Sequence, residues 1–133
     1  MLSPRELMDV ALKATVVPVL RESGFTGLYP HFRRVHVTHV DLLTFQFDIN
    51  GVGFVVEISR CGIGGITTQW GKHIPASKVR ACDIHPNDRF RIKPAEGSRT
   101  DSWFRFESGG YGNVANEVLA KLPVAHDYWS QRV

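Results

Sequence analysis

Hydrophobic and polar residues alternate along two neighbouring segments of the chain, residues 43–49 and 52–58. Side chains of a β-strand point to opposite faces in turn, so each segment is predicted to be a strand with one apolar face. The segments are joined by Asn50-Gly51, a dipeptide typical of a two-residue hairpin turn. Such a turn predicts four apolar cross-strand pairs: Ile49 with Val52, Phe47 with Phe54, Phe45 with Val56, and Leu43 with Ile58. A slip of one residue would separate all of these pairs, so the pattern also predicts the register.

Helical periodicity is predicted at both ends of the chain. Ser3 is suited to cap a helix that begins at residue 4, and the apolar stripe continues to about residue 24. Pro18 is expected to kink or break this helix, because proline lacks a backbone N–H and clashes with the preceding turn. Near the other end, Asn113 is expected to cap a last helix, which Pro123 ends or bends.

The remaining segments complete the predicted sheet. The apolar residues of segment 30–40 do not fall on one face of a single regular strand, which predicts a bulge or a register change there. Residues 89–93 and 102–106 alternate as two further strands. Between them and the hairpin, residues 61–88 are rich in glycine and proline, and we expect a long loop that is functional or contains an unrecognised element. The sequence therefore predicts one domain over residues 1–133, of the α+β class: an antiparallel sheet of about five strands with both helices on one face.

Composition restricts the class of protein. The chain has 133 residues, of which 43% are hydrophobic and 22% charged, so neither a disordered nor a membrane-embedded protein is expected. Charged residues (Arg5, Glu6 and Asp9) lie where a signal peptide would be apolar, which indicates a cytoplasmic protein. Cys61 and Cys82 form no CxxC pair and are expected to be free thiols, although the sequence leaves a disulfide open. The net charge of +3 permits an acidic partner without requiring one.

Histidine and aspartate residues suggest an alternative, enzymatic function. His39 and Asp41 share one face of a predicted strand, and Asp83 and His85 share a face if their segment is extended. Either pair could serve as a general base in a small hydrolase or as part of a metal site. A metal site needs three or four ligands, however, and His36 is expected on the opposite face from His39. We therefore assign no catalytic residue and expect no metal or cofactor.

The face of the sheet turned away from the helices is the predicted binding surface. Exposed Trp and Arg side chains are typical of the residues that contribute most to protein–protein binding. The residues expected on this open face are Gln46, Glu57, Arg89, Arg91, Lys93, Trp103 and Arg105. Two other interpretations remain open: a solvated face with cross-strand ion pairs, and a surface that binds nucleic acid through its cations.

Several segments together resemble a known family. They are Val19-Leu20-Arg21-Glu22-Ser23-Gly24-Phe25, Phe32-Arg33-Arg34, Arg89-Phe90-Arg91-Ile92 and Asp101-Ser102-Trp103-Phe104-Arg105-Phe106. They resemble a bacterial family of small domains of unknown function, number forty-three-oh-four in the DUF series. The resemblance implies a small cytosolic α+β domain and carries no catalytic residue with it. The expected function is that of a non-enzymatic protein-binding module, for example an immunity-type protein that binds a toxin of a bacterial competition system. The sequence leaves the oligomeric state open.

Overall fold

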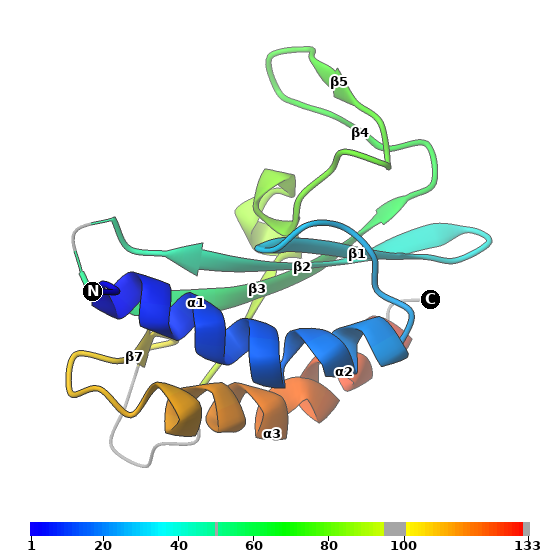
Figure 1. The fold of residues 1–133 in the computed structure, drawn as a ribbon. Coiled ribbons are helices and arrows are strands. Elements are labelled where there is room, and N and C mark those ends of the chain that lie inside the picture. The colour runs from blue at the N-terminus through cyan, green and yellow to red at the C-terminus, as the bar shows by residue number, and fades with distance from the viewer. Residues whose placement is uncertain (50, 95–100, 132–133) are drawn as a thin grey trace.

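The computed structural model describes residues 1–49, 51–94 and 101–131. It has an antiparallel five-stranded sheet with the N-terminal and C-terminal helices on one face, so the predicted α+β fold is confirmed (Figure 1). The helices are α1 (Pro4–Thr15), α2 (Val17–Glu22) and α3 (Tyr111–Gln131). The strands are β1 (His31–Val35), β2 (His39–Phe47), β3 (Gly53–Gly62), β4 (Ile66–Thr67), β5 (His73–Ile74), β6 (Phe90–Ile92) and β7 (Phe104–Arg105). Two 3₁₀ turns, η1 (Ala81–Asp83) and η2 (Pro86–Asp88), precede β6.

The sheet has the strand order β1-β2-β3-β6, and β7 also pairs with β3. Three of the predicted hairpin pairs are confirmed: Phe47 with Phe54, Phe45 with Val56, and Leu43 with Ile58. The fourth predicted pair is not part of the ladder, because β2 ends at Phe47 and the side chain of Ile49 is 93% exposed. The expected turn residue Asn50 and the residues 95–100 lie outside the described part of the chain.

The helices begin and end largely as their sequences predict. Ser3 and Glu6 form the capping box of α1, and the helix breaks before Pro18, where α2 begins at Val17. Gly24 follows α2 with φ of +97°, a conformation that glycine adopts without strain. The prediction for the last helix is only partly right, because α3 begins before Asn113 and continues past Pro123 to Gln131.

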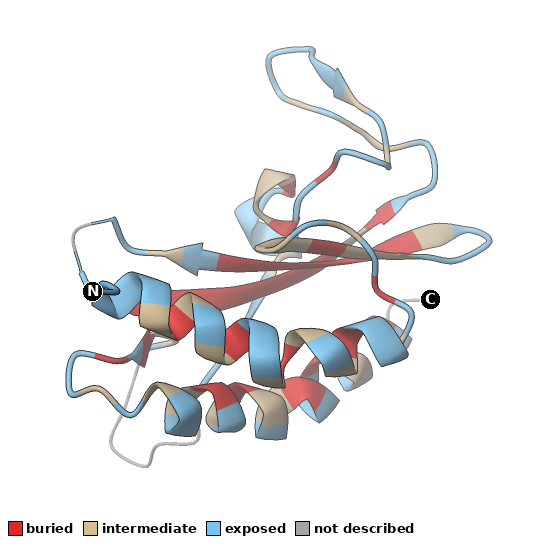
Figure 2. Ribbon diagram, in the orientation of Figure 1, coloured by how far each residue is buried: buried red, intermediate tan, exposed pale blue. Residues whose placement is uncertain are grey.

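Both faces of the sheet contribute residues to a core, so the face turned away from the helices is only partly open, and most residues of β2 and β3 are buried (Figure 2). The main core lies between the helices and the sheet and includes Phe45, Phe54 and Trp129. A second, smaller core lies on the opposite face, where residues 61–88 fold back over the strands. Its buried members are Val40, Leu42, Cys61, Val79, Ala81 and Ile84. The segment expected to be a long loop therefore contains β4, β5, η1 and η2, and it supplies this core.

The prediction of one strand with a bulge or a register change over residues 30–40 is wrong, because these residues belong to two strands whose pairing is regular. The chain instead leaves β1 after Val35 and turns into β2 at His39. Phe32 is buried in the main core, whereas Val35 is 65% exposed. The two apolar side chains therefore do not lie on one apolar face of a strand, as the pattern of the sequence suggests. The turn brings residues on the two sides of it together, and this determines the site described next. Within the described residues, no helix is both long and apolar enough to cross a bilayer.

Candidate functional site

The predicted binding face is partly covered and its charges are largely paired. Glu57 is 1% exposed, so the expectation that it lies on an open surface is wrong. Its carboxylate pairs with Arg89, whose Nε lies 3.2 Å from Oε2, and with Arg91, whose Nη2 lies 3.7 Å from Oε1. Arg89 is half-buried and also donates to the carbonyl oxygen of Cys82 at 2.9 Å. These contacts fasten the second core to β3 and β6.

The other predicted residues of this face remain accessible to different degrees. Gln46, Lys93 and Arg105 are exposed, and Trp103 is half-buried. Arg105 forms an ion pair with Asp101, with Nη2 2.6 Å from Oδ2. Three of the four predicted cations therefore have carboxylate partners. Since paired cations contribute less net positive charge, the geometry gives little support to the nucleic-acid interpretation.

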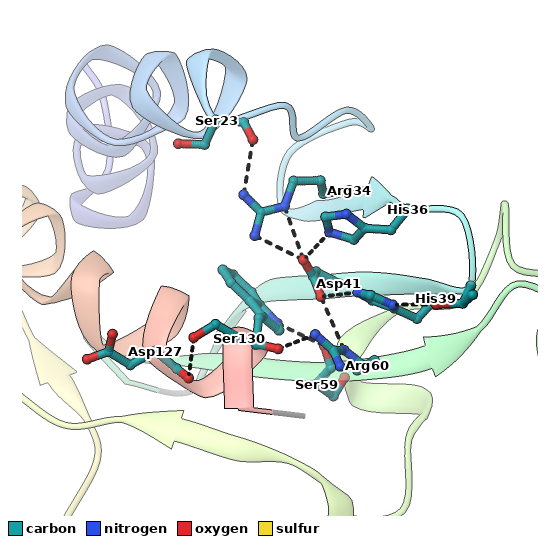
Figure 3. A network of polar contacts seen from close by, with 11 residues as sticks. Ser23, Arg34, His36, His39, Asp41, Ser59, Arg60, Asp127 and Ser130 are labelled. Carbon is teal, nitrogen blue, oxygen red and sulfur yellow. Dashed lines mark hydrogen bonds and ion pairs between the residues drawn. The ribbon is translucent and has the colours of Figure 1, made fainter. Parts of the chain in front are cut away.

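A buried polar cluster is centred on Asp41, where β1, β2 and β3 lie next to the C-terminal ends of α2 and α3 (Figure 3). Asp41 is on β2, faces the helices and is 1% exposed. Arg34 donates to its Oδ2 from Nε at 3.1 Å and from Nη2 at 2.9 Å. The Nε2 of His36 lies 2.7 Å from the same oxygen. On the other oxygen, Nε of Arg60 lies at 3.4 Å and Nε2 of His39 at 3.8 Å.

The position of these side chains follows from strand register. Asp41 is on a central strand, directly opposite Arg34 of β1 and opposite Arg60 of β3. Opposite charges at such cross-strand positions attract each other. The turn between β1 and β2 then stacks the rings of His36 and His39, with centroids 4.4 Å apart. The expectation that these two histidines lie on opposite faces is wrong, because they do not belong to one continuous strand.

The two arginines also bind the ends of helices. Arg34 donates from Nη1 to the carbonyl oxygen of Ser23, directly after α2, at 3.1 Å. Arg60 donates from Nη2 to the carbonyl oxygen of Trp129, near the end of α3. Carbonyl groups at a helix C-terminus attract cations. The indole of Trp129 in turn donates to the carbonyl oxygen of Ser59 at 3.0 Å. The cluster therefore joins both helical elements to the sheet.

The same cluster is the candidate metal site of the described residues. His36, His39 and Asp41 each offer a ligand atom, and these atoms lie within 4.8 Å of one another. The guanidinium groups of Arg34 and Arg60, however, already contact both oxygens of the carboxylate. A divalent cation would meet two positive charges there, which is electrostatically unfavourable. Burial, followed by the charge of Arg60, lowers the pKa of His39. The arrangement fits a structural ion-pair network better than a metal centre.

The second predicted acid–base pair has separate partners. Asp83 accepts from Arg80, with Nη2 3.1 Å from Oδ1, and the Arg80 side chain lowers the pKa of Asp83 against the opposing effect of burial. Nδ1 of His85 accepts from the backbone N–H of Asn87 at 3.1 Å. Both groups are therefore used in local turns. Cys61 and Cys82 are free thiols, as the sequence predicts.

A cleft and a projecting arm lie next to the Asp41 cluster. The cleft has a volume of about 670 Å³, and six of its lining residues are His39, Arg60, Ile66, Thr67, Ile84 and Tyr128. Residues 62–74, which we call the arm, contain β4 and β5 and stand away from the sheet (Figure 1). Sequence reasoning missed the arm, because its strands have two residues each and show no periodicity.

Large apolar side chains are exposed at this end of the molecule. On the arm, the side chain of Trp70 is 79% exposed and that of Ile63 is 56% exposed. In and beside the β1–β2 turn, Val35 is 65% exposed and Val37 is 89% exposed. Single exposed apolar residues are ordinary on protein surfaces, but an exposed Trp is uncommon. The arm is therefore the strongest candidate for a surface that contacts a partner.

Comparison with known proteins identifies the family of the chain. Searches of curated proteins and of solved structures found no match. The sequence profile of the family described as Domain of unknown function (DUF4304) matches residues 16–130. This span contains α2, all strands of the sheet, the arm and nearly all of α3, and it therefore includes the Asp41 cluster. The chain belongs to the DUF4304 family, the family that its sequence segments resemble.

Proposed function

We propose that the chain is a non-enzymatic domain that binds another protein. The observation that carries this proposal is the arm, which presents an exposed Trp70 at its tip and lines a cleft of about 670 Å³ with Ile66 and Thr67. Trp is among the residue types that contribute most to the energy of protein–protein binding. An immunity-type protein, which binds a toxin of a bacterial competition system in the cytosol, is the specific form of this function that we propose to test first.

The Asp41 cluster supports a non-enzymatic function. A general base needs a lone pair that is free to accept a proton from the substrate. Oδ2 of Asp41 accepts from two nitrogens of Arg34 and lies within hydrogen-bond distance of His36, and Oδ1 faces Arg60. A substrate would have to break this buried network before Asp41 could act. The cluster thus favours a structural role over the hydrolase alternative.

The proposed function is tested by reconstitution from purified components. The tagged full chain is used to recover proteins from the organism that produces it, and each candidate is expressed separately, beginning with the product of the neighbouring gene. We expect at least one candidate to form a stable complex with the chain, measured by titration calorimetry and size-exclusion chromatography. For the immunity-type form, co-expression of the chain should also restore growth of cells that express the partner. The proposal fails if no recovered protein binds the chain once both are purified.

A further inference from the structure

The arm is an ordered element that adds little to either core. At its root, Ile66 and Ile74 are half-buried against the second core, and the residues beyond them are mostly exposed (Figure 2). Gly65 closes the root with φ of +83°, and a Cβ there would meet the carbonyl oxygen of Ile74 and lie 2.9 Å from Cα of Pro75. A hairpin this short is marginally stable alone, so it depends on this close contact between its two limbs.

The tip of the arm is held by a hydrogen-bonded turn. Thr68 accepts at its backbone oxygen from the N–H of Gly71 at 2.9 Å. Its hydroxyl group donates to the carbonyl oxygen of Lys72 at 3.1 Å and accepts from the N–H of Lys72 at 3.0 Å. The turn therefore presents Trp70 to solvent from a fixed backbone. A preorganised side chain loses less conformational entropy when it binds.

The segment that contains the arm carries cations and no acidic residue, whereas Asp83 and Asp88 line the cleft at its root. Residues 61–82 contain Lys72, Lys78 and Arg80 and no Asp or Glu. Arg80 forms an ion pair with Asp83, just beyond this segment. Lys72 and Lys78 are exposed, and neither forms an ion pair with the described part of the chain. An exposed indole two residues away from the unpaired cation Lys72, in a segment that contains no carboxylate, is complementary to an apolar pocket with an acidic rim.

We propose that Trp70 and Lys72 at the tip of the arm, together with Lys78 beyond its root, form a docking element for a protein whose surface has an apolar pocket rimmed by Asp and Glu. This inference rests on the protein-binding function proposed above and adds the chemistry of the partner. A bilayer is a poorer match, because Trp70 is flanked by Gln69 and Gly71 and offers too little apolar area for anchoring. Nucleic acid is also a poorer match, since two cations neutralise few phosphates.

The cleft at the root of the arm extends the proposed interface. A stable interface buries about 800 Å² on each partner, which is more than one Trp and two Lys side chains provide. A partner seated on the arm would also cover the cleft of about 670 Å³, which Ile66 and Thr67 of the arm help to line. The docking element and the cleft together form one continuous surface at this end of the molecule.

The test uses a displayed library of random disulfide-constrained peptides as the probe and the full chain as the target. We expect the selected peptides to be rich in Asp and Glu around an apolar centre. Trp70→Ala should weaken their Kd about 30-fold or more. The double variant Lys72→Glu/Lys78→Glu should weaken it about 10-fold, and added salt should weaken binding to the wild type. The matched control Arg105→Gln, at an exposed cation far from the arm, should leave the Kd unchanged.

Several results would overturn the proposal. It is wrong if no peptide is enriched, if the selected peptides lack an excess of acidic residues, or if Trp70→Ala binds them as tightly as the wild type. Stronger, Trp70-dependent binding to duplex DNA or to phosphatidylglycerol vesicles would assign the arm to a different partner. Each variant is checked for an unchanged circular dichroism spectrum and thermal midpoint. If the proteins recovered by the full chain bind the Trp70→Ala variant as tightly as the wild type, the protein-binding function stands and the docking element is wrong.

Discussion

Replacing Asp41 by Asn tests whether the polar cluster holds the fold together. The amide keeps the shape of the side chain and one oxygen acceptor, but it removes the negative charge between Arg34 and Arg60. The arginine side chains are only 19% and 16% exposed, so water cannot fully replace the lost carboxylate. Removing one partner of a buried ion pair typically costs about 3–5 kcal/mol. Because both arginines retain some solvent contact, we expect about 3 kcal/mol.

The matched control is Asp101→Asn, which makes the same change in an exposed ion pair. Asp101 contacts Arg105 with Nη2 2.6 Å from Oδ2, and the two side chains are 46% and 42% exposed. Exposed ion pairs contribute about 0–1 kcal/mol, so this variant should be close to the wild type. Both substitutions remove one negative charge, so the difference between their free energies of unfolding reports the effect of burial.

Urea unfolding, followed by the fluorescence of the buried Trp129, measures the difference. With an m-value of about 2 kcal/mol/M, the loss at Asp41 corresponds to a shift of the urea midpoint of about 1.5 M. The reasoning is refuted if Asp41→Asn costs no more than Asp101→Asn. Refutation would mean that the cluster is not a structural network, and it would reopen the possibility that Asp41 is kept for chemistry.

Two further predictions concern the arm and pH. Gly65→Ala should weaken binding of the selected peptides even though the indole of the arm is intact, because the new Cβ meets the carbonyl oxygen of Ile74. The control is Gly64→Ala, where a Cβ meets nothing within 4 Å. Equal affinities of the two variants for the peptides would contradict the prediction. Burial is the largest cause that lowers the pKa of three histidines, His31, His39 and His126. The unfolded chain then binds more protons below the ordinary pKa of 6.5, so the free energy of unfolding should fall as the pH drops through that value. Urea unfolding at about pH 7.5 and about pH 5.5 checks this, and equal or greater stability at the lower pH would contradict it.

The main fold was accessible from the sequence because its signals are local. The alternation around the hairpin specifies the register, and Ser3 and Pro18 specify the start and the break of the first helical segment. Of the two alternatives for Pro123, an end of the last helix is excluded, since the helix continues through it to Gln131. The structure of residues 61–88 was missed because strands of two residues and short 3₁₀ turns leave no periodic pattern, even though Val79, Ala81 and Ile84 are buried in the second core.

The Asp41 cluster could have been found in part. The predicted register that places Leu43 opposite Ile58 also places Asp41 opposite Arg60, on the same face and one pair further along. Extending the hairpin by that pair would have revealed the ion pair. The contribution of His36 could not be found in this way, because it depends on a turn that was interpreted as a bulge or a register change. The exposure of Trp70 likewise depends on the arm standing away from the sheet, which no local pattern in the sequence predicts.

Hydrogen–deuterium exchange of the full chain, with and without a reconstituted protein partner, tests whether the arm is the binding surface. The partner should protect backbone amides of the arm, residues 62–74, and of the residues lining the cleft beside it. Exchange should change little in residues 89–93 and 103–105, which form the strand face first expected to bind. Protection confined to those strands, with exchange in the arm unaltered, would contradict this prediction.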